Sequence, residues 1–434
     1  MKDLQSGWLE RSGRKLLLAL LVAVPAWPAA ALAKAHKVDD YHWTGVERII
    51  AVGDIHGDYD SFMRVMQSAG LVDDRGRWAG GETHLVQLGD IPDRGPDTRK
   101  IFEHLERLKK EAAHKGGYVH MLIGNHEAMN MYGDLRYTTP GEYAAFEGPN
   151  SVRYREAQWE HHLDTLKKQD PEAFAKLDLA AFRKKWDQQY PLGWVEQRLA
   201  WQPNGEIGAK VIEDPVAIEI DGTLFMHGGF SAKYCKDSLK EITDTIHQGM
   251  AHYDYQNPGM VEDELGPLWY RGLATDSETK REAMVEAILD RYHAKRIVVG
   301  HTPTMGIVWP RFGGRVILDD VGISGYYGGY DAFLEITPDG LVAHYGDHEI
   351  PLPQGDAGRI EYLKQVIALN PGNPYLQSRL QKMLMASQAA AGDAAEKAPG
   401  EPAAKAPAEM TEAEKEAAAK EAQREAWLSP DNCR

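Results

Sequence analysis

The sequence contains very little cysteine, with only Cys235 and Cys433 among its 434 residues. Neither lies in a Cys-x-x-Cys or similar cluster, which excludes a cysteine-based zinc site. In an oxidising compartment the two cysteines could pair. The alternative is one buried thiol and one exposed thiol.

The sequence also lacks an excess of basic residues. It has 49 Lys and Arg against 65 Asp and Glu, which gives a formal net charge of -16. No run of Lys and Arg is large enough to bind a phosphate backbone, so nucleic acid is not an expected partner. An acidic protein can still bind a phosphate group where metal ions reverse the local field.

Long apolar runs are missing except near the N-terminus. Basic residues precede the apolar run Leu16–Val24, prolines interrupt the stretch after it, and Ala31-Leu32-Ala33 provides a small-residue cleavage site. This pattern predicts a signal peptide over residues 1–33, an exported and most simply periplasmic protein, and no stable membrane insertion after cleavage. The alternative is an uncleaved membrane anchor.

Five short apolar runs read as buried strands that lead into polar loops. They are Arg48–Gly53, His84–Gly89, Tyr118–Gly124, Thr223–Met226 and Arg296–Gly300. Predicted helices over Tyr59–Ala69 and Asp97–Lys110 separate the first three, and this alternation indicates βαβ units. Ligands of such folds collect beyond the carboxyl ends of the strands.

The rest of the chain divides into three parts. A catalytic domain is expected over residues 34–350, with a helical insertion at about 132–215 that either flanks the site or packs outside the core. Helices are predicted at about 153–168 and 171–189 within it. A helical extension follows over 351–386. A low-complexity, disordered tail is predicted over residues 387–434, with a solvated helix over Thr411–Trp427 that Thr411 caps. The alternative is that this segment binds a partner.

Five polar motifs follow the five predicted strands. Each begins with a histidine or with a glycine and a polar residue, and each alone could be a capped turn. They are Gly53-Asp54-Ile55-His56-Gly57-Asp58, Gly89-Asp90-Ile91-Pro92-Asp93-Arg94-Gly95, Gly124-Asn125-His126-Glu127, His227-Gly228-Gly229 and Gly300-His301-Thr302-Pro303. Five such motifs in this order predict one composite site rather than five independent turns.

The residue types in these motifs favour a centre of two metal ions, which can activate a hydroxide and neutralise phosphoryl oxygens. Asp90 has the two oxygens and the charge that a bridge between the ions requires. Asp54 and His56 complete the ligands of one ion. The ligands of the other are completed by Asn125, His227 and His301. Mixed imidazole, carboxylate and amide donors suit manganese, iron, zinc or nickel better than calcium, and manganese is the first expectation among these four.

Four more residues are candidates for catalysis. Arg94 can hold phosphate oxygens with its planar guanidinium, against the alternative of a surface ion pair. His126 can protonate the leaving oxygen, with Asp93 fixing its tautomer and raising its pKa, against a capping or packing role. Arg271 is either a second phosphate contact or a surface partner of an acidic residue. Asp58 and Glu127 are expected to support the loops.

This series of motifs resembles the calcineurin-like metallophosphoesterases, in their phosphoprotein phosphatase branch. Asn130, Gly133-Asp134, Arg136-Tyr137 and the stretch 266–271 are similar to the Shewanella-like protein phosphatases. The resemblance implies an α/β fold, an αββα sandwich of two packed mixed β-sheets flanked by helices. It also implies the metal ligands given above, Arg94 on phosphate and His126 paired with Asp93. Pro303 departs from the wider superfamily, in which many members have a second imidazole at that position.

The sequence therefore predicts a metal-dependent phosphoric monoester hydrolase. Its substrates are phosphorylated proteins or peptides, at Ser/Thr, at Tyr or at both, hydrolysed by a metal-activated hydroxide. The alternative is a hydrolase of nucleotides, dinucleoside polyphosphates or other small phosphoesters. A catalytically inactive binding module is disfavoured because all six ligands are present. No oligomeric state is predicted.

Overall fold

A computed structural model of the chain describes residues 36–353, 355, 357–393 and 411–434. The predicted signal peptide and most of the low-complexity stretch lie outside the described residues. Every residue of the predicted catalytic domain from residue 36 to residue 350 lies within them.

Two mixed β-sheets form the centre of the fold. The seven-stranded sheet has the order β1-β2-β6-β7-β8-β10-β9 and the six-stranded sheet has the order β13-β12-β11-β3-β4-β5. The strands are β1 His36–Lys37, β2 His42–Thr44, β3 Ile49–Val52, β4 His84–Gln87, β5 Tyr118–Met121, β6 Ala217–Ile220, β7 Thr223–Met226, β8 Arg296–Val299, β9 Trp309–Arg311, β10 Val316–Leu318, β11 Ala332–Thr337, β12 Gly340–Tyr345 and β13 His348–Pro351.

The five strands that precede the motifs run parallel within their own sheets. In the six-stranded sheet β3 pairs with β4 and β4 pairs with β5, both in parallel. In the seven-stranded sheet β7 pairs with β8 in parallel. Parallel neighbours end at the same edge of a sheet, so each sheet presents its motif loops together.

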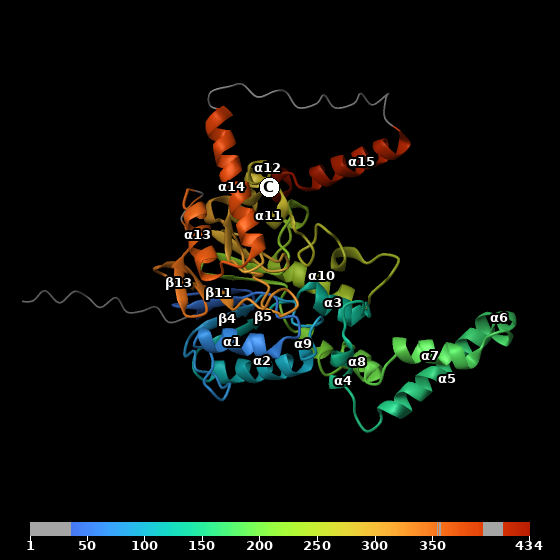
Figure 1. Cartoon of the computed structure of the whole chain (residues 1–434). Helices are drawn as coiled ribbons and strands as arrows, with labels where there is room; N and C mark the ends of the chain where they lie inside the picture. Colours follow the sequence, from blue (N-terminus) through green and yellow to red (C-terminus); the bar gives the residue numbers. More distant parts are fainter. Residues whose placement is uncertain (1–35, 354, 356, 394–410) are drawn as a thin grey trace, which may run out of the picture. The chain divides into compact units, whose positions relative to one another are not determined.

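Helices flank the two sheets, while the long helices of the insertion project away from them (Figure 1). In chain order they are α1 Tyr59–Ser68, α2 Thr98–Ala113, α3 Asn125–Tyr132, α4 Pro140–Ala145, α5 Ser151–Gln169, α6 Pro171–Ala175, α7 Leu179–Gln189, α8 Trp194–Ala200, α9 Gly208–Val211, α10 Leu239–Ala251, α11 Gly272–Thr275, α12 Glu278–Arg291, α13 Arg359–Leu369, α14 Pro374–Asp393 and α15 Glu412–Trp427. The predicted sandwich of two mixed sheets with flanking helices is confirmed.

One continuous apolar core joins the layers. Buried side chains of both sheets belong to it, such as Val86 on β4 and Val298 on β8. Helices α1 and α2 cover the six-stranded sheet through apolar faces that include Phe62, Leu105 and Leu108. This core fixes where the strands end, and therefore where the motif loops begin.

The helical insertion differs in detail from the prediction. Residues 171–189 form two helices, α6 and α7, instead of one. The reason is local: the Asp178 side chain accepts hydrogen bonds from the backbone N–H groups of Ala180 and Ala181 and so starts a new helix. Strands β6 and β13 were not predicted, since neither is followed by one of the five polar motifs.

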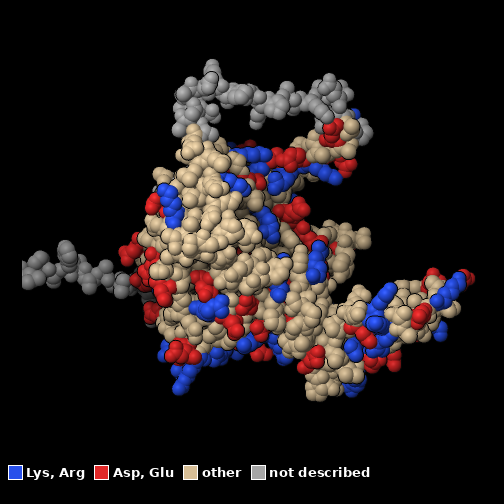
Figure 2. Space-filling model, viewed as in Figure 1, with Lys and Arg blue, Asp and Glu red and all other residues tan. Residues whose placement is uncertain are grey.

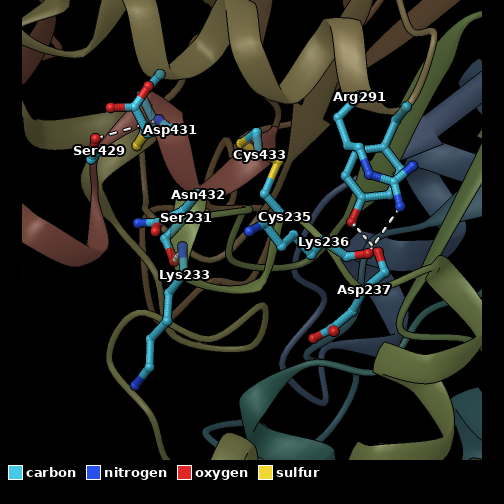
Figure 3. Close-up of a disulfide and its surroundings, with 12 residues drawn as sticks. Ser231, Lys233, Cys235, Lys236, Asp237, Arg291, Ser429, Asp431, Asn432 and Cys433 are labelled. Carbon is cyan, nitrogen blue, oxygen red and sulfur yellow. Dashed lines mark hydrogen bonds between the residues drawn. A yellow bond between two sulfur atoms is a disulfide. The ribbon is translucent and has the colours of Figure 1, made fainter.

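The C-terminal segment 411–434 departs from the expected disordered, solvated tail. Helix α15 begins at the predicted cap Thr411 but docks at its far end, where Leu428 is buried and Glu425 pairs with Lys280 and Arg281. Beyond it, Cys433 forms a disulfide with Cys235, as Figure 3 shows. Low sequence complexity did not reveal these contacts, because they join residues far apart in the chain.

The surface agrees with the mixed charge of the sequence. On the face shown in Figure 2, acidic and basic side chains are interspersed. A search of the described helices for one long and apolar enough to cross a lipid bilayer finds none.

Candidate metal centre

The five motif loops converge where the strands of both sheets end. Loops after β3, β4 and β5 bring residues from the six-stranded sheet, and loops after β7 and β8 bring residues from the other. Hydrogen bonds join the two sets: His227 Nδ1 donates to the Leu88 carbonyl at 2.8 Å, and the His301 N–H donates to Asp54 Oδ1 at 3.1 Å. The site therefore lies at the junction of the two sheets.

The backbone of these loops is held in an uncommon conformation. Five site residues that are not glycine have positive φ, between 49° and 72°: His56, Asp90, Asp93, Arg94 and His301. Such residues cost free energy, about 1–3 kcal/mol each, and they persist only where the surroundings impose them. They concentrate at functional sites, so the conformation itself indicates function.

Two motif glycines leave room for the carboxylates. A Cβ at Gly124 would stand 2.2 Å from Asp90 Oδ1, and one at Gly300 would stand 2.5 Å from Asp54 Oδ1. Any side chain at either position would displace an acidic group from the centre. These contacts explain why glycine precedes Asn125 and His301 in their motifs.

A first set of donor atoms surrounds His56. Its Nδ1 lies 3.1 Å from the Pro92 carbonyl, which can only accept, so Nδ1 carries the proton and Nε2 presents a lone pair. Nε2 lies 3.9 Å from both Asp54 Oδ2 and Asp90 Oδ2. All three side chains are buried, with at most 2% of each exposed. The arrangement matches the predicted ligands of one ion.

A second set surrounds His227. Its Nδ1 donates to a carbonyl, which leaves Nε2 with a lone pair. That atom lies 3.0 Å from Asn125 Oδ1, 3.0 Å from His301 Nδ1 and 3.3 Å from Asp90 Oδ2. Nε2 and the Asn125 oxygen both have lone pairs and no proton to share. Such a contact is repulsive unless a cation binds both atoms. Two donors that each lie about 2.0–2.3 Å from one metal ion come this close to each other.

The charge of the cluster fits a cation as well. Burial raises the pKa of Asp54 well above its usual value, and the neighbouring Asp320 and Asp90 raise it further. Burial also raises the pKa of Asp90, but His227 and His126 outweigh burial and hold the Asp90 pKa well below its usual range. Divalent ions offset this concentration of buried negative charge. The donor set therefore fits a metal centre.

Geometry groups the donors slightly differently from the motifs. Among the described residues, two groups have potential ligand atoms within 4.8 Å of one another: His56, Asp90 and His126, and Asp90, His227 and His301. Asp90 belongs to both groups, as expected for a bridge. The structure thus brings all six predicted ligands together, and the binding of metal by each remains a prediction.

His126 is already engaged through its other nitrogen. Its Nδ1 lies 2.6 Å from Asp93 Oδ2, and its Nε2 lies 3.8 Å from Asp90 Oδ2. Burial lowers the His126 pKa, but Asp90 and the hydrogen bond that His126 donates to Asp93 outweigh burial, so the pKa is raised above its usual value. A buried imidazole that keeps its proton and faces the metal ligands can act as a general acid.

Arg94 extends into an aromatic surrounding. Its guanidinium carbon lies 4.4 Å from the ring centre of Tyr137, 4.7 Å from that of Tyr326 and 5.3 Å from that of Tyr327. Its Nε is buried without a hydrogen-bond partner among the described residues. A cation held this way by tyrosine faces can point its remaining N–H groups toward a phosphate.

Arg271 lies at the rim of the same site. Its Nη1 donates to the His301 carbonyl at 2.6 Å and to Thr302 Oγ1 at 3.2 Å. The guanidinium is therefore anchored beside a predicted ligand, and its side chain is exposed. This position is compatible with a second phosphate contact.

The two supporting carboxylates act on the loops, as expected. Glu127 accepts hydrogen bonds from the backbone N–H groups of Asp90, Ile91 and Gly124. Asp58 caps α1 at Ser61 and also accepts from the N–H of Gly325. Both fix the motif loops from behind.

The sequence missed several residues that border the centre. Asp320 is fully buried against Asp54, and Thr138 Oγ1 donates to Asp93 Oδ1 at 2.9 Å. No local motif marks either position. Asp320 lies just after β10, and Thr138 lies at the start of the insertion.

Comparison with known proteins agrees with this geometry. The family description "Calcineurin-like phosphoesterase" matches residues 47–305. An uncharacterised protein of Schizosaccharomyces pombe is 32% identical over 301 residues, which are 67% of this chain and 77% of that protein. Shewanella-like protein phosphatase 2 of Arabidopsis thaliana is 30% identical over 68% of this chain and 76% of its own length.

A solved structure has a similar fold. The cold-active protein-tyrosine phosphatase of a psychrophilic Shewanella species matches with a TM-score of 0.55 and 25% sequence identity. The match covers 73% of this chain and 83% of that one.

Proposed function

We propose that this chain, which belongs to the calcineurin-like phosphoesterase family and is a metal-dependent phosphatase, uses two metal ions to hydrolyse phosphomonoesters on proteins. One observation carries the proposal. Two groups of buried donor atoms share Asp90, and the His126–Asp93 pair and Arg94 stand directly beside them. Metal ligands, an acid and a phosphate-binding cation thus occur within one small volume.

The ions, when bound, supply positive charge for the phosphoryl oxygens and lower the pKa of water. The chain supplies the rest. Arg94 holds phosphate oxygens through a planar fork, and Arg271 offers a second cationic group at the rim. His126 gives a proton to the leaving oxygen, and Asp93 keeps its imidazole in the required tautomer and orientation.

Phosphotyrosine peptides are the substrates that we favour first. Tyr137, Tyr326 and Tyr327 surround Arg94 with aromatic faces, which suits an aromatic ring next to the phosphate. The similar Shewanella enzyme is named as a protein-tyrosine phosphatase. Phosphoserine and phosphothreonine peptides lack a ring and would use the same metal centre without these contacts.

We also propose manganese as the metal, with iron, zinc or nickel as alternatives, because the donors mix imidazole, carboxylate and amide groups. An exported, periplasmic location follows from the predicted signal peptide. The Cys235–Cys433 disulfide supports it, since disulfides persist in oxidising compartments.

The test is a turnover screen of the full chain after metal removal and reloading with each metal in turn. Phosphotyrosine, phosphoserine and phosphothreonine peptides would be compared with nucleotides and dinucleoside polyphosphates. We expect phosphopeptides to have the highest kcat/KM and about two ions per chain by elemental analysis. A clear preference for dinucleoside polyphosphates would reject the protein phosphatase assignment in favour of small phosphoesters.

A further inference from the structure

The loop that carries Asp93 and Arg94 needs support from outside its own motif. Both residues have positive φ, 72° and 67°, so two consecutive residues other than glycine are in the left-handed region. Within the loop, the Gly95 N–H donates to the Asp93 carbonyl at 2.7 Å. One such bond does not account for two strained residues, and other contacts must hold them.

The start of the helical insertion provides those contacts. The Arg94 N–H donates to the Tyr137 carbonyl at 3.0 Å, and Thr139 Oγ1 donates to the Gly95 carbonyl at 3.4 Å. Between them, Thr138 Oγ1 donates to Asp93 Oδ1 at 2.9 Å. Three consecutive residues of the insertion thus contact three consecutive residues of the catalytic loop.

Thr138 fixes the carboxylate that orients the acid. Asp93 is completely buried, and its two oxygens have different partners: Oδ2 faces His126 Nδ1 at 2.6 Å and Oδ1 accepts from Thr138. Bonds to both oxygens stop the carboxylate from rotating about its Cβ–Cγ bond. The Tyr137 ring, with its centre 5.0 Å from that of His126, packs beside the imidazole.

The far side of Asp93 is closed as well. Glu142 on α4 has no exposed surface and lies next to Asp93 and Thr98. Burial raises the pKa of the Glu142 carboxyl well above its usual value, with a contribution from Asp93. Because Glu142 and Asp93 are both completely buried, the insertion also shields the Asp93–His126 pair from solvent.

We propose that Thr138 is a positioning residue of the phosphatase reaction, through which the insertion holds the Asp93–His126 pair in the geometry for proton donation. The inference rests on the phosphatase function proposed above. It gives the insertion a definite role, where the sequence alone left open whether that segment flanks the site or packs elsewhere. Misplacement of a catalytic group by about 1 Å can cost up to 10²-fold in rate.

The first test is the dependence of rate on the leaving group. Aryl phosphates with leaving-group pKa values from about 7 to 10 span the range in which proton donation becomes necessary. We expect Thr138→Val to lower kcat about 10-fold for phenyl phosphate and less than 3-fold for p-nitrophenyl phosphate, with little change in KM. Thr138→Ser, which keeps the hydroxyl, should restore the wild-type dependence.

Thr165→Val is the matched control. It makes the same chemical change in the same insertion, on α5, where the exposed Thr165 hydroxyl donates to the His161 carbonyl at 2.9 Å. Its rates should equal those of the wild type for every substrate. Equal losses for all leaving groups in Thr138→Val, or none, would overturn the positioning role.

A second measurement does not depend on turnover. The proton shared by His126 Nδ1 and Asp93 lies in a short hydrogen bond of 2.6 Å. In the protein loaded with diamagnetic zinc, it should give a far-downfield ¹H NMR signal. Asp93→Asn should abolish that signal and so assign it. Thr138→Val should shift or broaden it, while Thr165→Val should not. An unchanged signal in Thr138→Val rejects the inference even if no phosphoester is hydrolysed, and a shifted signal without turnover rejects only the proposed function.

Discussion

The metal centre and the C-terminal segment 411–434 are held in place by opposite means. Ligands of the centre come from five loops, all buried, and many short hydrogen bonds fix each loop from behind. The C-terminal segment is attached at a few points, chiefly the ion pairs of Glu425, the buried Leu428 and the disulfide of Cys433. The difference teaches that positioning a reactive group requires many constraints, whereas docking a helix requires only a few strong ones.

The largest effect should come from the bridge of the centre. Asp90→Asn keeps the size of the side chain but removes the charge shared by the two donor groups. We expect kcat/KM to fall at least ~10³-fold, equivalent to about 4 kcal/mol. The measurement is phosphopeptide turnover together with metal content. Full activity with two bound ions would reject Asp90 as the bridge.

The strongest anchor of the C-terminal segment is the disulfide. Cys433→Ser opens a covalent loop of 198 residues and should lower the free energy of unfolding by about 2–5 kcal/mol. Turnover at low temperature should stay near the wild-type value, because none of the predicted ligands lies in the segment. Denaturant titration and kcat, measured on the same sample, check both statements. A large loss of activity in the folded variant would show that the two regions are coupled.

Arg94 tests how strictly the centre depends on geometry. Arg94→Lys keeps the positive charge but loses the planar fork that faces three tyrosine rings. We expect KM for phosphotyrosine peptides to rise and kcat/KM to fall about 10–100-fold, or roughly 1.4–2.7 kcal/mol. Stability should hardly change, in contrast to Cys433→Ser. An unaffected KM would leave Arg94 with a structural role only.

The smallest effect should be the pH response of the docked helix. The hydrogen bonds from Arg281, and then from Lys280, lower the pKa of Glu425 to about 2. A lowered pKa in the folded state means that the stabilisation is present above the ordinary value and is lost as pH falls toward 2. In Cys433→Ser, the amide protection factors of α15, that is, exchange rates relative to those of an unfolded chain, should therefore fall from about pH 4.5 downward. Adding Glu425→Gln should give low protection factors at all pH values, and a pH response that survives in that variant would contradict this cause.

The convergence of the motif residues could be predicted because the information that marks them is local. Each of the residues Asp54, Asp90 and His301 follows an apolar run within a few positions, and a strand end with a polar residue after it is readable without knowledge of the fold. Thr138 was not predictable in this way, because its partner Asp93 is 45 residues away. The docking of 411–434 was predicted wrongly for the same reason.

The disulfide also bears on how the molecule is made. Cys235 follows the loop of His227, and its partner is reached only after β8 to β13 and helices α10 to α15 have been synthesised. The thiols can meet once the segment 425–433 has docked against α12, where Glu425 pairs with Lys280 and Arg281. Oxidation would therefore occur late, after the C-terminal half has assembled. With only two cysteines in the chain, no other intramolecular pairing competes with this bond, and its formation would mark the completed folding of the phosphatase.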